Sequence, residues 1–273
     1  MNHPSSARAR MFRQLHAGPD ILILANAWDA GSARLIESLG ARAVATTSAG
    51  VAWSNGYPDG DALPVSLLAA TIASIARVIG VPLSADIEGG YSSDPASIGE
   101  TVTRVIDAGA VGINIEDGAG TPDLLCAKIE QTKCAATRSG IDLFVNARTD
   151  VYLRGLATGQ VALDETIARA GRYRNAGADS IFVPGVVEAG DIRDIVKGVS
   201  LPLNVLSWPG LPAYDELRAL GVRRLSAGAA VAAAAWNQAR SSATAFLAQG
   251  SSESRSDGGT MSTRDINALL RGK

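Results

Sequence analysis

Two carboxylates, Asp86 and Glu88, occupy alternate positions at the end of the apolar stretch "VPLSADIEGG" and are followed at once by two glycines. Glu116 follows the next apolar run in the same way. Acids crowded on neighbouring strands repel one another unless a cation joins them or a proton neutralises one. Carboxylate oxygens favour a hard divalent ion, Mg²⁺ or Mn²⁺. We therefore expect these acids to form a metal site, although a strand ending in a solvated turn would also explain Asp86 and Glu88.

Histidine usage narrows the chemistry further. The chain has two histidines, His3 and His16, and both precede the first apolar run. This argues against a His-ligated zinc site or a Ser-His-Asp triad among the strand ends. The remaining chemical groups are carboxylates, a metal ion, backbone amides and an arginine. Arg148 follows the apolar run after that of Glu116, where a guanidinium holds a substrate carboxylate in a forked pair or forms a salt bridge with a neighbouring acid.

Other polar residues at strand ends have less specific readings. Ser48, Ala49 and Gly50 offer a hydroxyl and small-residue amides that suit a carboxylate oxygen, and Asn204 is either a substrate contact or an internally satisfied polar group. Asp29 precedes a helical pattern and is expected to cap that helix. Asp117 lies one residue beyond Glu116, and Asp150 lies two residues beyond Arg148. We interpret both as structural residues.

A repeated pattern predicts the elements that position these residues. Four segments combine a helix ending in glycine with a short apolar run, and four more apolar runs lie between them. The eight expected strands lie near 21–25, 43–47, 82–86, 111–116, 142–147, 180–184, 202–206 and 223–227. The clearest helices are expected at 65–79, 94–108, 123–139, 162–176 and 229–248. Eight βα units favour a (β/α)₈ TIM barrel over an open doubly wound sheet, and such barrels work at the carboxyl ends of their strands.

The domain organisation follows from the same pattern. Residues 1–248 are expected to form the barrel, whereas 249–273 reads as a flexible Ser/Gly-rich linker followed by a short helix. The connection 48–64 is longer than usual between a strand and a helix, which suggests a lid. Cys126 and Cys134 share one helical pattern, roughly 12 Å apart, which is beyond disulfide reach.

Composition and charge exclude several classes of protein. The chain has 273 residues, 47% of them hydrophobic, and a formal charge of −2. This charge gives no electrostatic case for binding nucleic acid or an anionic membrane. The first twenty residues contain no continuous apolar stretch, so we expect neither a secretory signal nor a membrane span. We predict a cytoplasmic enzyme or binding protein for a small molecule.

These motifs together resemble the isocitrate lyase/phosphoenolpyruvate mutase superfamily. The similarity covers about residues 21–150, in "LILANAWDAGSARL", "TTSAGVAWSNGYPDG", "LSADIEGGYS", "GINIEDG" and "FVNARTD". "SADIEGGY" is similar to the Asp-x-Asp-x-Gly-[YF] metal motif of that family, with Glu88 in place of the second Asp. "YPDG" is similar to its mobile loop and supplies Asp59 as the catalytic Asp.

The resemblance implies specific roles. Asp86 would coordinate Mg²⁺ directly, with Glu88 and Glu116 acting through bound waters. Ser48, Ala49 and Gly50 would bind the carboxylate and oxo group of a pyruvyl-like substrate, and Arg148 would hold a substrate carboxylate. The implied fold is a barrel whose eighth helix is exchanged between subunits, hence a homodimer or homotetramer.

One expected segment of family lyases is absent. Their Lys-Lys-Cys-Gly-His-type loop after the fourth strand is replaced here by "EDGAGTPDLLCAKIEQ", in which Cys126 lies inside a helical pattern. We therefore expect a Mg²⁺-dependent lyase that cleaves a C–C bond in a small 2-oxo- or 2-hydroxy-dicarboxylate through a metal-stabilised, pyruvate-like enolate. Decarboxylation of an oxaloacetate-type substrate, C–P bond cleavage of a phosphonopyruvate, and a non-catalytic dicarboxylate-binding barrel remain as alternatives.

Overall fold

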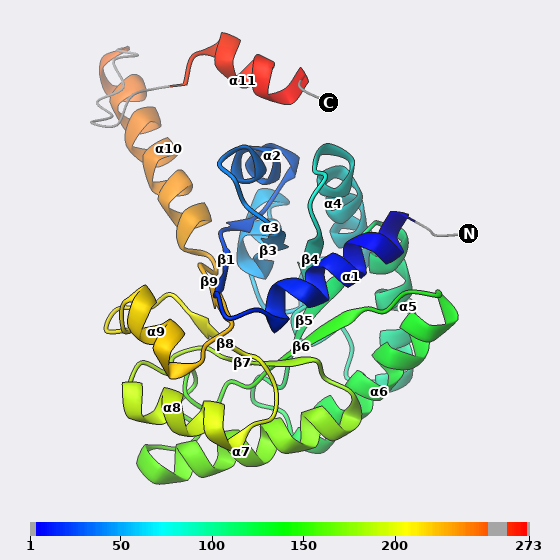
Figure 1. Cartoon of the computed structure of the whole chain (residues 1–273). Coiled ribbons are helices and arrows are strands. Elements are labelled where there is room, and N and C mark those ends of the chain that lie inside the picture. Colours follow the sequence, from blue (N-terminus) through cyan, green and yellow to red (C-terminus); the bar gives the residue numbers. More distant parts are fainter. Residues whose placement is uncertain (1–3, 251–260, 272–273) are drawn as a thin grey trace.

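The chain folds into a parallel barrel surrounded by helices, as the computed structural model of residues 4–250 and 261–271 shows (Figure 1). The strands are hydrogen-bonded in the order β1-β9-β8-β7-β6-β5-β4-β3-β2, and every pair is parallel. Their bounds are β1 Leu22–Leu24, β2 Asn26–Ala27, β3 Val44–Thr46, β4 Leu83–Asp86, β5 Gly112–Glu116, β6 Phe144–Arg148, β7 Ser180–Val183, β8 Leu203–Leu206 and β9 Arg224–Ser226.

The two ends of this strand order belong to one stretch of chain. Only Ala25 separates β1 from β2; β1 pairs with β9 and β2 pairs with β3. The sheet therefore returns on itself, and β1 with β2 act as the first of eight barrel strands. This confirms the predicted (β/α)₈ barrel and rules out the open doubly wound sheet.

Helices follow the strands at the predicted places. They are α1 Pro4–Ala17, α2 Ala30–Ser38, α3 Ser48–Ser54, α4 Val65–Val78, α5 Pro95–Asp107, α6 Pro122–Arg138, α7 Gly159–Ala176, α8 Ala189–Gly198, α9 Tyr214–Leu220, α10 Ala230–Gln249 and α11 Thr263–Arg271. Within the described residues, no helix is long and apolar enough to cross a membrane.

The segment 48–64 differs from the expectation of one long loop. Its first seven residues form α3, whose Ala49–Ala52 stretch is buried, because these small residues allow the helix to sit close against the barrel. The irregular part of the connection is therefore 55–64, which carries Asp59.

Local signals in the sequence account for the helix boundaries. Asp29 caps α2 through a capping box with Ser32, as predicted. Asp94 accepts a hydrogen bond from the Ala96 amide and Pro95 opens α5. The four glycines that end the repeated helices, Gly40, Gly109, Gly177 and Gly221, all have a positive φ.

Helix α1 closes the amino-terminal end of the barrel. Phe12 and His16 of α1 pack on Phe144 of β6, with His16 stacked on the Phe144 ring at 4.1 Å between centroids. A side chain at Gly112 would meet the Phe12 ring at 2.6 Å, so the glycine permits this close approach. Burial, with smaller effects of Arg224 and Arg13, lowers the pKa of His16 to about 3. The rings of Phe12, His16 and Phe144 thus close the floor of the barrel.

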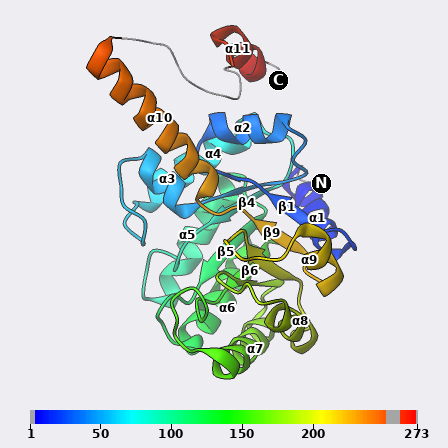
Figure 2. The ribbon, with the colours of Figure 1, turned by 90° about the vertical axis from the view of Figure 1, so that its left-hand side faces the viewer.

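The last helices leave the barrel surface. Helix α10 starts beside α3 and then projects away from the barrel, while α11 lies over α2, where Arg34 Nε donates to the Leu269 carbonyl at 3.1 Å (Figures 1 and 2). The short C-terminal helix was expected. Most of the predicted linker, 251–260, lies outside the described residues. Cys126 and Cys134 are both free, as predicted.

Candidate functional site

A cavity of about 120 Å³ lies at the carboxyl ends of the strands. Five of the predicted site residues line it: Ser48, Ala49, Asp59, Asp86 and Arg148. They come from α3, the 55–64 loop, β4 and β6. We call this space the mouth cavity; its other lining residues include Asn26, Thr47, Asn114, Leu153, Phe182 and Ser226.

Asp86 is fixed by hydrogen bonds on both carboxylate oxygens. Its Oδ1 accepts from the Glu88 amide at 3.1 Å and its Oδ2 accepts from Asn114 Nδ2 at 3.1 Å. The Asp86 amide donates to Thr46 Oγ1 at 2.8 Å. Burial raises the pKa of the Asp86 carboxyl, while Arg148 and these hydrogen bonds oppose the shift. This acid is rigid, buried and open to the mouth cavity.

Arg148 forms the salt bridge that was one of its two readings from the sequence. Its Nε and Nη2 form a fork with Asp150 at 2.6 and 3.1 Å, and its Nη1 pairs with Glu116 Oε2 at 2.8 Å. The guanidinium is thus salt-bridged while it also lines the mouth cavity. Asp150, interpreted from the sequence as structural, has the function of aiming Arg148.

Glu116 is the second carboxylate that pairs with Arg148. Burial raises its pKa to about 8; Arg148 opposes this shift, and the neighbouring carboxylates Asp86, Asp150 and Glu88 add to it. Glu116 is thus a carboxyl group with excess negative charge around it, which favours an additional cation.

The Glu88 side chain does not line the mouth cavity with Asp86 but turns towards the 55–64 loop. Its Oε2 accepts from the amides of Gly60 (2.9 Å) and Asp61, and its Oε1 accepts from the Tyr91 hydroxyl at 3.0 Å. Asp61, Glu88 and Tyr91 are the described non-glycine residues with positive φ. The physical reason is the backbone: at φ 51°, Glu88 directs its side chain to the 55–64 loop. Such strain typically gathers at functional sites.

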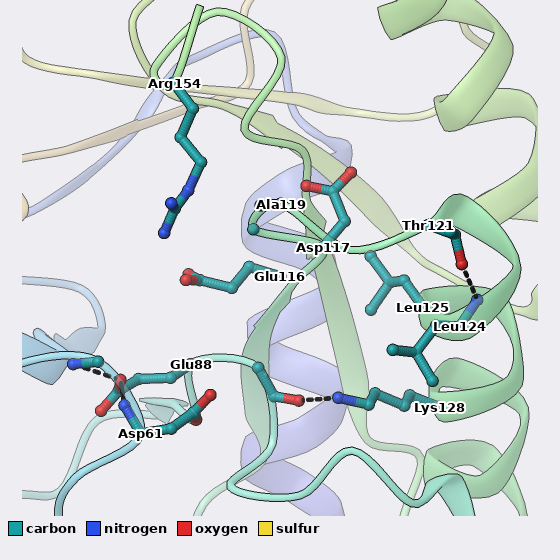
Figure 3. Close-up of a pocket in the computed structure, with 13 residues that line it drawn as sticks. Asp61, Glu88, Glu116, Asp117, Ala119, Thr121, Leu124, Leu125, Lys128 and Arg154 are labelled. Carbon is teal, nitrogen blue, oxygen red and sulfur yellow. Dashed lines mark hydrogen bonds between the residues drawn. The ribbon is translucent and has the colours of Figure 1, made fainter. Parts of the chain in front are cut away.

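A second cavity of about 310 Å³ lies beyond Glu88 and Glu116, and we call it the side cavity (Figure 3). Glu88 and Asp61 form one wall, and Leu124 and Leu125 of α6 form the opposite wall. Arg154 reaches in towards Glu116. Asp86 lines the mouth cavity, whereas Glu88 and Glu116 line the side cavity. Arg148 of the mouth cavity pairs with Glu116 of the side cavity at 2.8 Å, so this ion pair marks the boundary between the two spaces.

The acids of this boundary suit a hard cation that keeps water. In the described part of the chain, no three His, Cys, Asp or Glu side chains are grouped tightly enough to form a complete ligand set. Mg²⁺ typically retains several waters and contacts one or two carboxylates directly, so it does not need such a group. The donor set contains only oxygen, and burial raises the pKa of each of the three acids. These residues fit Mg²⁺ or Mn²⁺.

Two predicted substrate-binding residues do not line the mouth cavity. Gly50 lies behind it, where an added Cβ would meet Thr47 and Trp28 at 2.8 and 2.9 Å. Its observed role is close packing of α3. Asn204 is buried in the barrel interior, where its Oδ1 accepts from Ser226 at 3.2 Å, while its Nδ2 has no partner among the described groups.

Sequence reasoning missed a polar network below the mouth. Asn114 Oδ1 accepts from Asn146 at 2.9 Å and from Arg224 Nη2 at 3.1 Å, which directs the Asn114 amide nitrogen at Asp86. Arg224 is fully buried and has no ion pair in the described structure. Burial lowers its pKa to about 9, and Asp86 opposes the shift. The signal was the alternation along β5, where Gly112, Asn114 and Glu116 share one face.

Comparison with known proteins agrees with this geometry. Residues 12–247 match the family model of phosphoenolpyruvate phosphomutase. The chain is 38% identical to an uncharacterized protein of Mycobacterium tuberculosis, over 80% of this chain and 81% of that one. It is 31% identical to the oxaloacetate decarboxylase of Paraburkholderia xenovorans, over 83% and 77%.

Further similarity comes from a lyase and a solved structure. The 2-methylisocitrate lyase of Escherichia coli is 30% identical, over 71% of this chain and 69% of that protein. A crystal structure of a candidate lyase/mutase from Burkholderia cenocepacia has a TM-score of 0.87 and 37% identity, covering 97% and 96% of the two chains. The chain belongs to the phosphoenolpyruvate mutase family, within the isocitrate lyase/phosphoenolpyruvate mutase superfamily, and is a lyase-type enzyme of that group.

Proposed function

We propose that this protein is a Mg²⁺-dependent lyase that cleaves a C–C bond in a small 2-oxo- or 2-hydroxy-dicarboxylate and leaves a pyruvate-like enolate. The observation that supports it is the mouth cavity, where the buried carboxylate of Asp86 and the guanidinium of Arg148 face one space. Asp86 would bind the metal ion, and Arg148 would bind a carboxylate of the substrate.

Each residue of the mouth has a defined part in this reaction. Asp86 would hold the metal ion directly, with Glu88 and Glu116 reaching it through water. Bound Mg²⁺ or Mn²⁺ supplies Lewis-acid stabilisation of negative charge on the substrate's oxo and carboxylate oxygens, a contribution of several kcal/mol. The Ser48 hydroxyl and the Ala49 amide, at the start of α3, orient the oxo-acid end of the substrate.

Arg148 and Asp59 complete the binding of the substrate in the mouth cavity. Arg148 receives a carboxylate in a forked pair, with its direction fixed by Asp150. Asp59 is exposed on the 55–64 loop yet lines the mouth cavity. It is therefore placed to exclude water and contact the substrate as this loop closes.

Deuterium exchange tests the shared enolate chemistry. Incubated with pyruvate and Mg²⁺ in heavy water, the protein is expected to exchange the methyl protons, followed by NMR. Asp86→Asn should slow this exchange by about a hundred-fold or more, since one misplaced group in the site has an effect of that order. Asp107→Asn, at an exposed position on α5, should have no effect. Exchange that continues without metal or in Asp86→Asn contradicts the proposal.

Oxaloacetate-type decarboxylation is the second candidate, and one feature favours it. The connection from β5 to α6 consists of residues 117–121, Asp-Gly-Ala-Gly-Thr, with no Cys, His or Lys. Cys126 lies farther along, half-buried on α6. After decarboxylation, solvent protonates the enolate and no such side chain is required.

A turnover panel separates the candidates. Oxaloacetate, 2-methylisocitrate, malate analogues and phosphonopyruvate represent decarboxylation, C–C lyase and C–P reactions. Pyruvate and CO₂ from oxaloacetate alone would favour the decarboxylase, and a second organic acid from a longer substrate would favour the lyase. If the protein binds these acids without turnover or exchange, a non-catalytic binding role replaces both.

We also propose that the protein is a homodimer or homotetramer in which α10 of one copy covers the barrel of another. On the outer face of β1, Ile23 is 55% exposed, beside a groove of about 340 Å³ between β1 and α2. On α10, Trp236, Phe246 and Leu247 are exposed at 53, 55 and 85%. Among the described residues, no helix covers this outer face of β1 and no barrel face covers the apolar residues of α10, so two copies could cover each other's exposed surfaces.

A further inference from the structure

The buried carboxylate of Asp150 holds two guanidinium groups. Its oxygens accept from Arg148 Nε and Nη2, and Oδ2 also accepts from Arg154 Nε at 3.0 Å. Asp150 is fully buried and is fixed by its own amide, which donates to Asp117 Oδ1 at 2.9 Å. The two arginines therefore diverge from one rigid anchor.

These arginines serve different cavities. Arg148 lines the mouth cavity, while Arg154 lines the side cavity and points towards Glu116 (Figure 3). Only Nε of Arg154 is engaged; within the described residues, its Nη1 and Nη2 have no hydrogen-bond partner. Its side chain is half exposed, so a ligand can reach these two nitrogens from solvent.

The acids of the side cavity already have protein partners. Asp117 accepts from Arg169 at 2.9 Å and from Tyr173 at 2.6 Å. Asp61 accepts a hydrogen bond from the Tyr91 amide, and Glu88 accepts from amides of the 55–64 loop. Glu116 is paired with Arg148. The side cavity also has N–H donors without a partner among the described residues, on Arg154 and Lys128. The Lys128 Nζ donates to the Gly89 carbonyl at 2.5 Å and has two further protons. With the negative charge around Glu116 offset by the proposed metal ion, Arg154 and Lys128 give the side cavity free donors for an anionic group.

The boundary of the two cavities is where the proposed metal ion belongs. Asp86 faces the mouth cavity, and Glu88 and Glu116 face the side cavity. A small acid chelating a cation between them would be adjacent to both spaces. With its chelating end in the mouth cavity of about 120 Å³, a longer arm would extend past the Arg148–Glu116 pair towards the side cavity of about 310 Å³.

We propose that Arg154 is a specificity-determining residue that binds a distal carboxylate of the substrate in the side cavity. The inference rests on the proposed function and specifies its substrate class: an acid with a chelating oxo- or hydroxy-acid end, a short apolar arm and a terminal carboxylate. Leu124 and Leu125 contact the carbon atoms of the arm. Arg154 forms a forked pair with the terminal carboxylate through its free Nη1 and Nη2.

Binding of matched ligands tests this assignment by calorimetry in the presence of Mg²⁺. 2-Oxoglutarate and 2-oxoadipate carry a distal carboxylate, whereas 2-oxopentanoate and 2-oxohexanoate have the same chain lengths and end in a methyl group. Oxalate has only the chelating end. The proteins are the full-length wild type, Arg154→Gln, Arg154→Lys and the control Arg172→Gln. Arg172 lies on α7, is similarly exposed and pairs with Asp123.

The wild type is expected to prefer the dicarboxylate of at least one pair by ten-fold or more, the usual effect of a charged hydrogen bond. Arg154→Gln should remove that preference while oxalate affinity stays unchanged, Arg154→Lys should retain part of it, and Arg172→Gln should retain all of it. This pattern supports the proposal. A purely structural Arg154 would not discriminate between members of a pair.

Three results overturn the inference while leaving the proposed function in place. In the first, Arg154→Gln keeps the preference for the dicarboxylate. In the second, the wild type binds oxalate but does not prefer the dicarboxylate of either pair. In the third, Arg154→Gln lowers the affinity for oxalate as much as the affinity for the dicarboxylates. The last would mean that Arg154 acts through Asp150 on the mouth cavity. Absence of Mg²⁺-dependent oxalate binding in the wild type overturns the proposed function itself, and the inference with it.

Discussion

Glu116 illustrates how burial and charge determine the behaviour of one side chain. In an unfolded chain its carboxyl group would titrate near 4.3, whereas in the fold burial raises its pKa to about 8. Between these values the folded state holds a proton that the unfolded state releases. Folding stability from this group is therefore fully present below pH 4.3 and is lost as the pH rises through about 8.

A pH series with and without Mg²⁺ checks this residue. We expect the melting temperature of the metal-free protein to fall between pH 6 and pH 9, and Mg²⁺ to raise it more at pH 9, because the ionised Glu116 then needs a counter-charge. Glu116→Gln cannot ionise, so its melting temperature should vary less with pH. If Glu116→Gln shows the same dependence as the wild type, other groups control it.

The sequence predicted which residues would gather at the carboxyl ends of the strands better than it predicted the direction of each side chain. Asp86, Arg148, Ser48 and Ala49 reach the mouth because strand alternation and strand ends fix their direction. Glu88 lines the side cavity instead, because its left-handed backbone, which composition does not reveal, turns the side chain towards the 55–64 loop. Arg154 was missed because it lies in the irregular turn after β6, and Lys128 because its position on α6 does not reveal that its Nζ reaches the Gly89 carbonyl.

At the scale of elements, Glu88 joins the 55–64 loop to the β4–α5 connection. Its carboxylate accepts from loop amides at one oxygen and from Tyr91 at the other. The family motif has an Asp here, which is shorter by one methylene. The longer side chain thus provides the reach required to hold the loop.

Hydrogen exchange can measure this attachment. In Glu88→Asp the carboxylate falls short of the Gly60 and Asp61 amides, so these amides should exchange about ten-fold faster, as expected for the loss of a hydrogen bond of roughly 1.4 kcal/mol. Glu100→Asp, on the exposed face of α5, is the control. Unchanged protection of the loop in Glu88→Asp would show that other contacts hold it.

Element boundaries were predictable wherever a specific residue marks them. Asp29, Asp94 and the glycines with positive φ determined helix ends that the structure shows. Helix α3 was missed because a seven-residue helix of small side chains has too few turns for a periodic pattern. The first strand was expected as one run and is divided at Ala25.

At the scale of the whole molecule, the outward face of β1 and the exposed helix α10 define a testable assembly. Ile23→Asp places a charge in the groove and should shift the protein from dimer or tetramer towards monomer. Light scattering after size exclusion measures the mass. Val161→Asp, at another exposed apolar position on α7, should leave the mass unchanged. A monomeric wild type contradicts the assembly.

The plug of Phe12, His16 and Phe144 has a consequence for the order of events in catalysis. Because these rings close the amino-terminal end of the barrel, every molecule must arrive and depart at the carboxyl ends of the strands. The part of the ligand that binds deepest, against Asp86, therefore enters first and is released last. Product-inhibition kinetics should therefore show ordered release, in which the product fragment bound in the side cavity leaves before the pyruvate-like fragment bound against Asp86.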